Sequence, residues 1–278
     1  MNTWTWLWKS VLAWVVLVVA TMIATAIVPV NAPSVPHQFA WWLLTNFMVV
    51  AAITFAAVRS DWRGLRLGFA AAVLPLFVSL TDMLEGAIFL GHLGIDWKRL
   101  AVESVLSYAL SAPVWGMIFS IGREKTPASL HPFASRPVSE RVWKYAVSAF
   151  SYLFLYYLAG ALVFPFIRDF YASQTVPATR TIVMLQLFVR GPLFVALCLL
   201  LVRMVRLAGA KGALAVGMMF TIISGVAPLL MPNPFFPDAV RWAHFCEVSS
   251  SNFLFGAFVG WLWGERERAG ALTVGQAA

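Results

Sequence analysis

The sequence predicts an all-α fold, a polytopic transmembrane bundle of about eight helices. Hydrophobic residues make up 61% of the 278 residues and charged residues only 12%, whereas soluble domains average about 25% charged. The apolar residues also gather in runs of the length that a helix needs to cross a hydrocarbon core about 30 Å thick. A water-soluble fold could not bury so much apolar surface, so the soluble classes are excluded.

The eight predicted spans alternate with short polar segments. They are about 6–28, 40–58, 67–89, 100–121, 145–166, 181–202, 213–231 and 243–263. The first run is longer than the apolar core of a signal peptide, so we expect it to be retained as a span. Pro75 lies inside the third run, where we expect it to bend the helix.

The net charge of +8 reflects membrane orientation and not a nucleic-acid partner. Lys and Arg fall in the segments between spans, 14 on one side and five on the other, and Arg190 lies within a span. Because cytoplasmic loops carry such an excess, we expect an inner-membrane protein with both termini in the cytoplasm. The lipid bilayer is therefore an expected partner of the protein.

A long polar stretch divides the chain into two four-span halves. The first half is 1–122, the stretch at 123–144 is expected to be a cytoplasmic connecting loop, and the second half is 145–278. Four spans in each half would give both halves the same orientation, as in the parallel repeats of transporters.

A shift of 144 residues brings matching residues of the two halves together. It places Val58 on Val202, Arg59 on Arg203, Glu103 on Glu247 and Gly116 on Gly260. The identities are few, and apolar segments align with one another easily. Duplication of a four-span unit and chance similarity are therefore both open.

Polar residues within the spans are the functional candidates, because ionisable groups are expensive to keep in a membrane. Seven of the twelve acidic residues lie at or near the predicted outer boundary. We expect one outward-facing pocket whose substrate-binding or proton-relay residues are Arg190, Glu247, His244, Glu85, Glu103, Gln186, Asp82 and Asn252.

Two spans carry their polar residues at helical spacing. His244, Glu247 and Ser251 follow one another by three and four residues, which places them on one helical face. Asp82, Glu85, Phe89 and His92 are spaced by three, four and three, and share a face if the helix continues that far. Both groups lie at the outer ends of their spans.

Arg190 lies near the middle of its span, four residues after Gln186. Pro192 lacks an N–H and leaves the carbonyl of Phe188 without its helical donor, so we expect the helix to kink beside the arginine. The polar residues of four spans would then converge on one side of the membrane.

Three interpretations compete for this cluster. In the first, Arg190 pairs with Glu85, Glu103 or Glu247 and only holds helices together, the usual fate of a buried charge. In the second, the pocket receives an amphiphilic or anionic small-molecule cargo, with Arg190 as the anchor and the carboxylates as proton carriers. This interpretation needs no cofactor.

The third interpretation is a metal-dependent intramembrane hydrolase. His92 and His244, together with a carboxylate, would hold a divalent metal ion that activates water. The two histidines could alternatively hold a haem. Against hydrolysis, the sequence contains neither HExxH nor GxSxG. A fourth class is a non-catalytic accessory membrane subunit. In such a protein the polar residues of the last span would face another chain.

The segment from Leu230 to Phe255 contains a Pro-Asn-Pro loop followed by Arg241, His244, Glu247 and Ser251-Asn252-Phe253. This segment resembles uncharacterised bacterial multi-span integral membrane proteins, as do Gln186, Arg190 and Gly191. The resemblance covers mainly the second half and implies no activity. The convergence of polar residues from four spans on one side of the membrane predicts a transport-like or lipid-handling function.

Overall fold

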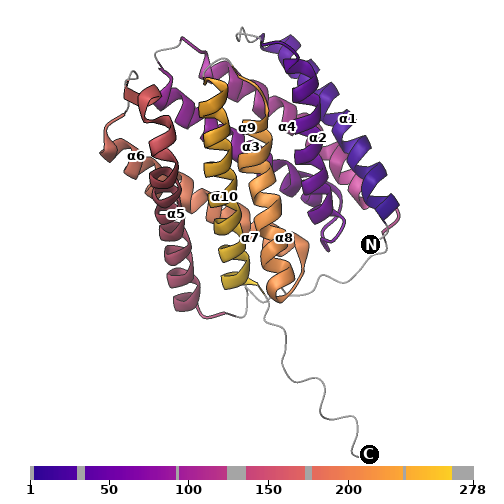
Figure 1. Ribbon diagram of the computed structural model, residues 1–278. Helices are drawn as coiled ribbons and strands as arrows, with labels where there is room; N and C mark the ends of the chain where they lie inside the picture. Colours follow the sequence, from indigo (N-terminus) through magenta and orange to yellow (C-terminus); the bar gives the residue numbers. More distant parts are fainter. Residues whose placement is uncertain are drawn as a thin grey trace, which may run out of the picture.

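The protein is an all-helical bundle, described by a computed structural model for residues 3–29, 35–91, 94–123, 136–172, 177–233 and 236–264 (Figure 1). The helices of the first half are α1 (Thr3–Ile27), α2 (Gln38–Ala57), α3 (Gly64–Phe89) and α4 (Trp97–Ser120). Those of the second are α5 (Val138–Ala172), α6 (Thr179–Leu185), α7 (Gly191–Val205), α8 (Gly209–Thr221), α9 (Ala227–Leu230) and α10 (Asp238–Trp263). Two π-helical turns, η2 (Gln186–Arg190) and η3 (Ile222–Val226), join α6 to α7 and α8 to α9.

All eight predicted spans are helical. Seven of the described helical stretches are long and apolar enough to cross a membrane, which makes this a multi-pass membrane protein. The eighth, α10, has sufficient length, but the polar run from Ser249 to Asn252 makes it less apolar. Helix α5 extends beyond the predicted span at both ends, and α3 continues without interruption through Pro75.

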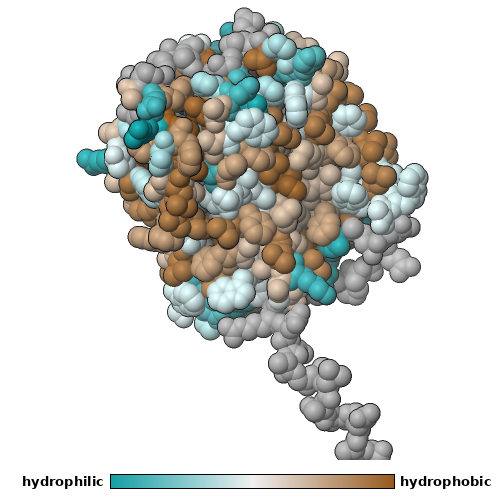
Figure 2. All heavy atoms as spheres, viewed as in Figure 1, coloured by the Kyte–Doolittle hydropathy of each residue, from teal (hydrophilic) through white to brown (hydrophobic). Residues whose placement is uncertain are grey.

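The outside of the bundle is strongly apolar. Figure 2 shows apolar side chains over the middle of the visible face, with hydrophilic ones toward its two ends. Helix α5 exposes Phe150, Phe154, Leu162 and Phe166 by 63%, 64%, 68% and 81%. Such exposure would be unfavourable in water, and it suits contact with lipid tails.

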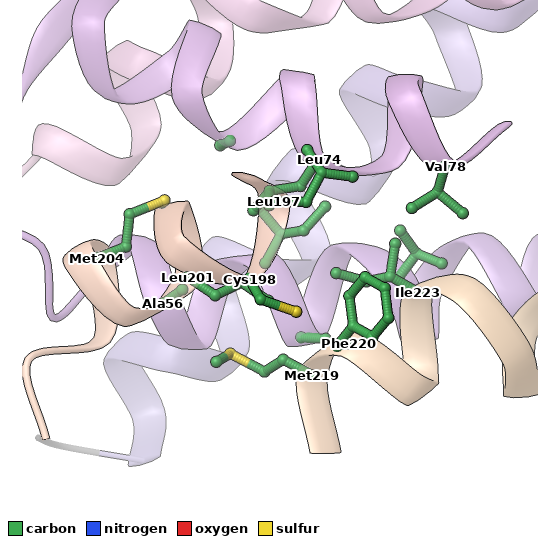
Figure 3. Packing of buried hydrophobic residues seen from close by; sticks show 14 of the residues in the cluster. Ala56, Leu74, Val78, Leu197, Cys198, Leu201, Met204, Met219, Phe220 and Ile223 are labelled. Atoms are coloured by element: carbon green, nitrogen blue, oxygen red, sulfur yellow. The ribbon is translucent and has the colours of Figure 1, made fainter. Parts of the chain in front are cut away.

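A buried apolar core joins the two halves (Figure 3). Leu74 of α3, Leu201 of α7 and Phe220 of α8 all belong to this core. These three side chains are each at most 1% exposed. The halves therefore pack as one body instead of as two independent bundles.

The helices pair in the same order within each half. In the first half the largest contacts are α3 with α4, α1 with α4 and α1 with α2. In the second half they are α8 with α10, α5 with α10 and α5 with α7. This correspondence is the one that the 144-residue shift would require.

Glycines allow the closest of these approaches. A Cβ on Gly116 would lie 2.3 Å from the carbonyl oxygen of Gly64, so α4 and α3 meet backbone to backbone. Gly260, its counterpart after the shift, lies similarly against Ala213, where a Cβ would be 2.9 Å from the Cα. Small residues serve this role in membrane helix pairs.

Basic side chains cap the C-terminus of the last helix of each half. Lys9 donates to the carbonyl oxygens of Phe119 and Ile121 at 3.1 and 2.8 Å. Arg136 donates to those of Trp263 and Gly264, both at 3.2 Å. A cation at a helix C-terminus satisfies free carbonyls and complements the helix dipole.

Candidate functional site

A cavity of about 300 Å³ lies at the upper end of the bundle in Figure 1, where α3, α5 and α9 end and α10 begins. Side chains from both halves line it, and most are apolar or aromatic. The lining also includes six of the residues predicted from the sequence, namely Asp82, Glu85, Arg190, His244, Glu247 and Asn252. Polar residues far apart in the chain thus share one void.

Arg190 forms the charged centre of the cavity wall. It is 4% exposed, and its Nη2 donates to Asp82 Oδ1 at 2.9 Å while Nη1 contacts Glu85. Gln186 Nε2 donates to the other oxygen of Glu85 at 3.1 Å. Of the partners considered for Arg190, Glu85 is therefore the one present, with Asp82 added. This network connects α3 of the first half to η2 of the second.

The helix carrying Arg190 is widened where the arginine enters the cavity. The amide of Gly191 donates to the carbonyl of Gln186, five residues earlier, and the next residue is Pro192. The deformation expected at this proline thus takes the form of a π-turn. Such turns occur often at functional sites, because they re-aim the side chains on either side.

A second π-turn reaches the same cavity. The amide of Ala227 donates to the carbonyl of Ile222, immediately before Pro228. Ser224, inside this turn, accepts a hydrogen bond from Asn252 Nδ2 at 2.9 Å. Both widened turns of the second half therefore place polar side chains against the void.

Three residues form a hydrogen-bonded row on another wall. His244 Nδ1 lies 2.8 Å from Glu247 Oε2, and its Nε2 lies 2.8 Å from the Tyr171 hydroxyl. With a neutral imidazole, Nδ1–H donates to the carboxylate and Nε2 accepts from tyrosine. These contacts form a continuous row of hydrogen-bonding groups from Tyr171 through His244 to Glu247, along which a proton could pass.

Aromatic side chains make up much of the remaining wall. Phe236 packs against His244 with ring centroids 5.4 Å apart, and Phe170 packs against Phe236 at 5.9 Å. Tyr152 and Tyr156, four residues apart on α5, face inward from a largely exposed helix. The cavity thus combines a few polar groups with a broad aromatic surface, as small-molecule sites do.

The tyrosines and Trp97 of the cavity wall were not predicted from the sequence. Tyr152, Tyr156 and Tyr171 lie in or at the end of an apolar span, where tyrosine is usual at the interface. The four-residue spacing of Tyr152 and Tyr156 was the available signal. Trp97 opens α4, a common position for an interfacial tryptophan, yet its ring packs on Gly86 and lines the cavity.

Three of the predicted site residues are absent from the cavity lining, and one of them lies outside the described residues. Glu103 does not line the cavity, because it faces α1 and hydrogen-bonds to Thr25. Gln186 reaches the site only through its hydrogen bond to Glu85. His92 lies outside the described residues, and α3 ends at Phe89, before that position.

Within the described residues, no group of three or more His, Cys, Asp and Glu is arranged to hold a metal ion. His244 is engaged through both ring nitrogens, with Tyr171 and Glu247.

The chain matches no protein-family model, and neither the curated proteins nor the solved structures contain a match to it.

Proposed function

We propose that this is an inner-membrane protein that binds an amphiphilic small molecule in the cavity and moves it within or across the bilayer. This is a transport-like or lipid-handling function. The single observation that carries it is the cavity, in which an apolar and aromatic wall surrounds Arg190, Asp82, Glu85, His244 and Glu247. A molecule with an apolar body and a polar end matches such a wall.

A purely structural cluster accounts for only part of this arrangement. Arg190 with Asp82 and Glu85 is a network that could hold helices together. His244 and Glu247 form a separate pair, and both line the same void. Polar groups kept for packing alone would be expected to meet across filled space.

The cargo is proposed to enter from the outer side of the membrane. The cavity lies where α10 begins, and this is the end opposite the one at which α1 begins (Figure 1). The distribution of Lys and Arg predicts a cytoplasmic position for the latter end. The direction of entry therefore rests on that charge bias.

The proposal is tested by filling the cavity. Ser251→Phe adds a large ring to the lining, whereas Leu254→Phe changes a 52% exposed position on the same helix. Protein purified in lipid nanodiscs would be examined by native mass spectrometry for bound amphiphiles. We expect bound molecules in the parent and in Leu254→Phe, and their loss in a folded Ser251→Phe variant. The same amphiphiles retained in Ser251→Phe would overturn the proposal.

A further inference from the structure

The cavity contains more negative than positive groups. Its described lining has three carboxylates, Asp82, Glu85 and Glu247, against the guanidinium of Arg190. Both terminal nitrogens of Arg190 already face carboxylates, so little of its charge is available to an anion. Glu247 has only the imidazole of His244 as a partner among the described contacts.

Uncompensated charge in a membrane interior is costly, so the excess must be balanced. Protons and bound cations can both offset this excess. The aromatic wall also favours a bound cation, because the faces of Tyr, Trp and Phe rings attract cations. Tyr152, Tyr156 and Trp97 supply such rings within the same lining.

Two buried donors also point to an occupant. Arg190 Nε and Trp97 Nε1 have no hydrogen-bond partner among the described residues, and both residues line the cavity. A buried donor without an acceptor is energetically unfavourable. A ligand that carries an acceptor oxygen, or water bound with it, would satisfy them.

We infer that the ligand of this cavity is a hydrophobic organic cation, and that it exchanges with a proton held among the carboxylates. The inference rests on the proposed function and names the class of its cargo. Binding of one cation to Glu247 and the aromatic wall releases the proton to water, so the total charge of the site stays constant. The cavity then carries either a proton or cargo.

The groups that face Glu247 set the background for this exchange. They are Tyr152, Tyr156 and Tyr171 of α5, Asp82 and Glu85 of α3, Arg190 of η2 and His244 of α10. The lining residues of η3 and α9 are Ser224, Pro228 and Leu229, which carry no charge. Lowering the pH raises the concentration of protons, which compete with the cation for the carboxylates.

A pair of ions with one shape and opposite charges tests the inference. Tetraphenylphosphonium and tetraphenylborate would be titrated into the protein in zwitterionic-lipid nanodiscs. We expect saturable binding of the phosphonium alone, weakening as the pH falls. Calorimetry in two buffers of different ionisation enthalpy should report the release of about one proton per cation.

Variants locate the effect. Glu247→Gln should weaken phosphonium binding by about 10-fold or more and remove its proton release. If Glu247→Gln does not fold, Asp82→Asn takes its place as the test variant. It also removes one carboxylate and should weaken phosphonium binding. Glu103→Gln is the control, because Glu103 occupies the matching position of the first half and contacts Thr25 outside the cavity.

Equal or tighter binding of tetraphenylborate, or unchanged phosphonium affinity in a folded Glu247→Gln protein, would overturn the inference. The proposed function would survive either result if Ser251→Phe still displaced the co-purified amphiphile. If instead that variant retained the amphiphile, the cavity itself would be the wrong site.

Discussion

Asp61 and Arg203 form a buried ion pair that joins the two halves of the chain. Each carboxylate oxygen accepts a hydrogen bond of 2.9 Å from a separate guanidinium nitrogen. The Asp61 side chain is completely buried, and Arg206 lies 3.9 Å from one of its oxygens. The connection between α2 and α3 is thereby fixed to the end of α7, at the opposite end of the bundle from the cavity.

Replacing this aspartate should destabilise the whole protein. Asp61→Asn leaves Arg203, whose side chain is 14% exposed, without its counter-charge, and removal of one partner of a buried pair typically costs about 3–5 kcal/mol. The melting temperature in detergent measures the loss. Asp169→Asn is the matched control, because that carboxylate is 96% exposed. Equal melting temperatures for the two variants would contradict the assignment.

The same pair predicts a pH dependence. Burial opposes ionisation of Asp61, but the hydrogen bonds and charge of Arg203, aided by Arg206, outweigh it and lower the pKa below its ordinary 3.8. A carboxylate whose pKa is lower in the folded than in the unfolded protein stabilises the fold at pH values above the unfolded-state pKa. This stabilisation is lost as the pH falls through the folded-state pKa. The stability difference between parent and Asp61→Asn should hold at neutral pH and shrink only below pH 3.8. Shrinkage already above that pH would show that other groups dominate.

Arg190 provides a test that separates charge balance from function. Arg190→Ala leaves Asp82 and Glu85 facing each other without a cation, so we expect a large loss of stability, again about 3–5 kcal/mol. The triple variant Arg190→Met, Asp82→Asn and Glu85→Gln removes all three charges together. It should recover most of the melting temperature without recovering phosphonium binding. Recovery of both would show that this network has no part in binding.

Much of the fold could be predicted because hydropathy alone determines which segments are helical spans. The depth of each polar residue follows from its distance along the helix, which is why Asp82, Glu85, His244 and Glu247 were expected at one level. Depth does not tell which way a side chain faces around the bundle. Glu103 lies at a similar depth but faces α1, and only the packing of α4 between α1 and α3 decides that.

The pairing of Arg190 with residues of α3 could not be predicted from the sequence either. It depends on how the second half docks against the first through the core of Leu74, Leu201 and Phe220. The tyrosines of α5 were missed for a related reason, since a tyrosine in an apolar span looks the same whether it faces lipid or a cavity. The proline at position 192 indicated a deformed helix, but not its widening into a π-turn.

Because of the widened turn at 186–190, the location of Arg190 depends on how many residues the turn contains as well as on which residues they are. A π-turn holds one residue more than the α-helical turn it replaces, and one residue corresponds to a rotation of about 100°. Deleting a single codon within 187–189 would restore an ordinary helix and rotate one side of the span relative to the other. The guanidinium would then leave its two carboxylates, although every amino acid of the charged network would still be encoded.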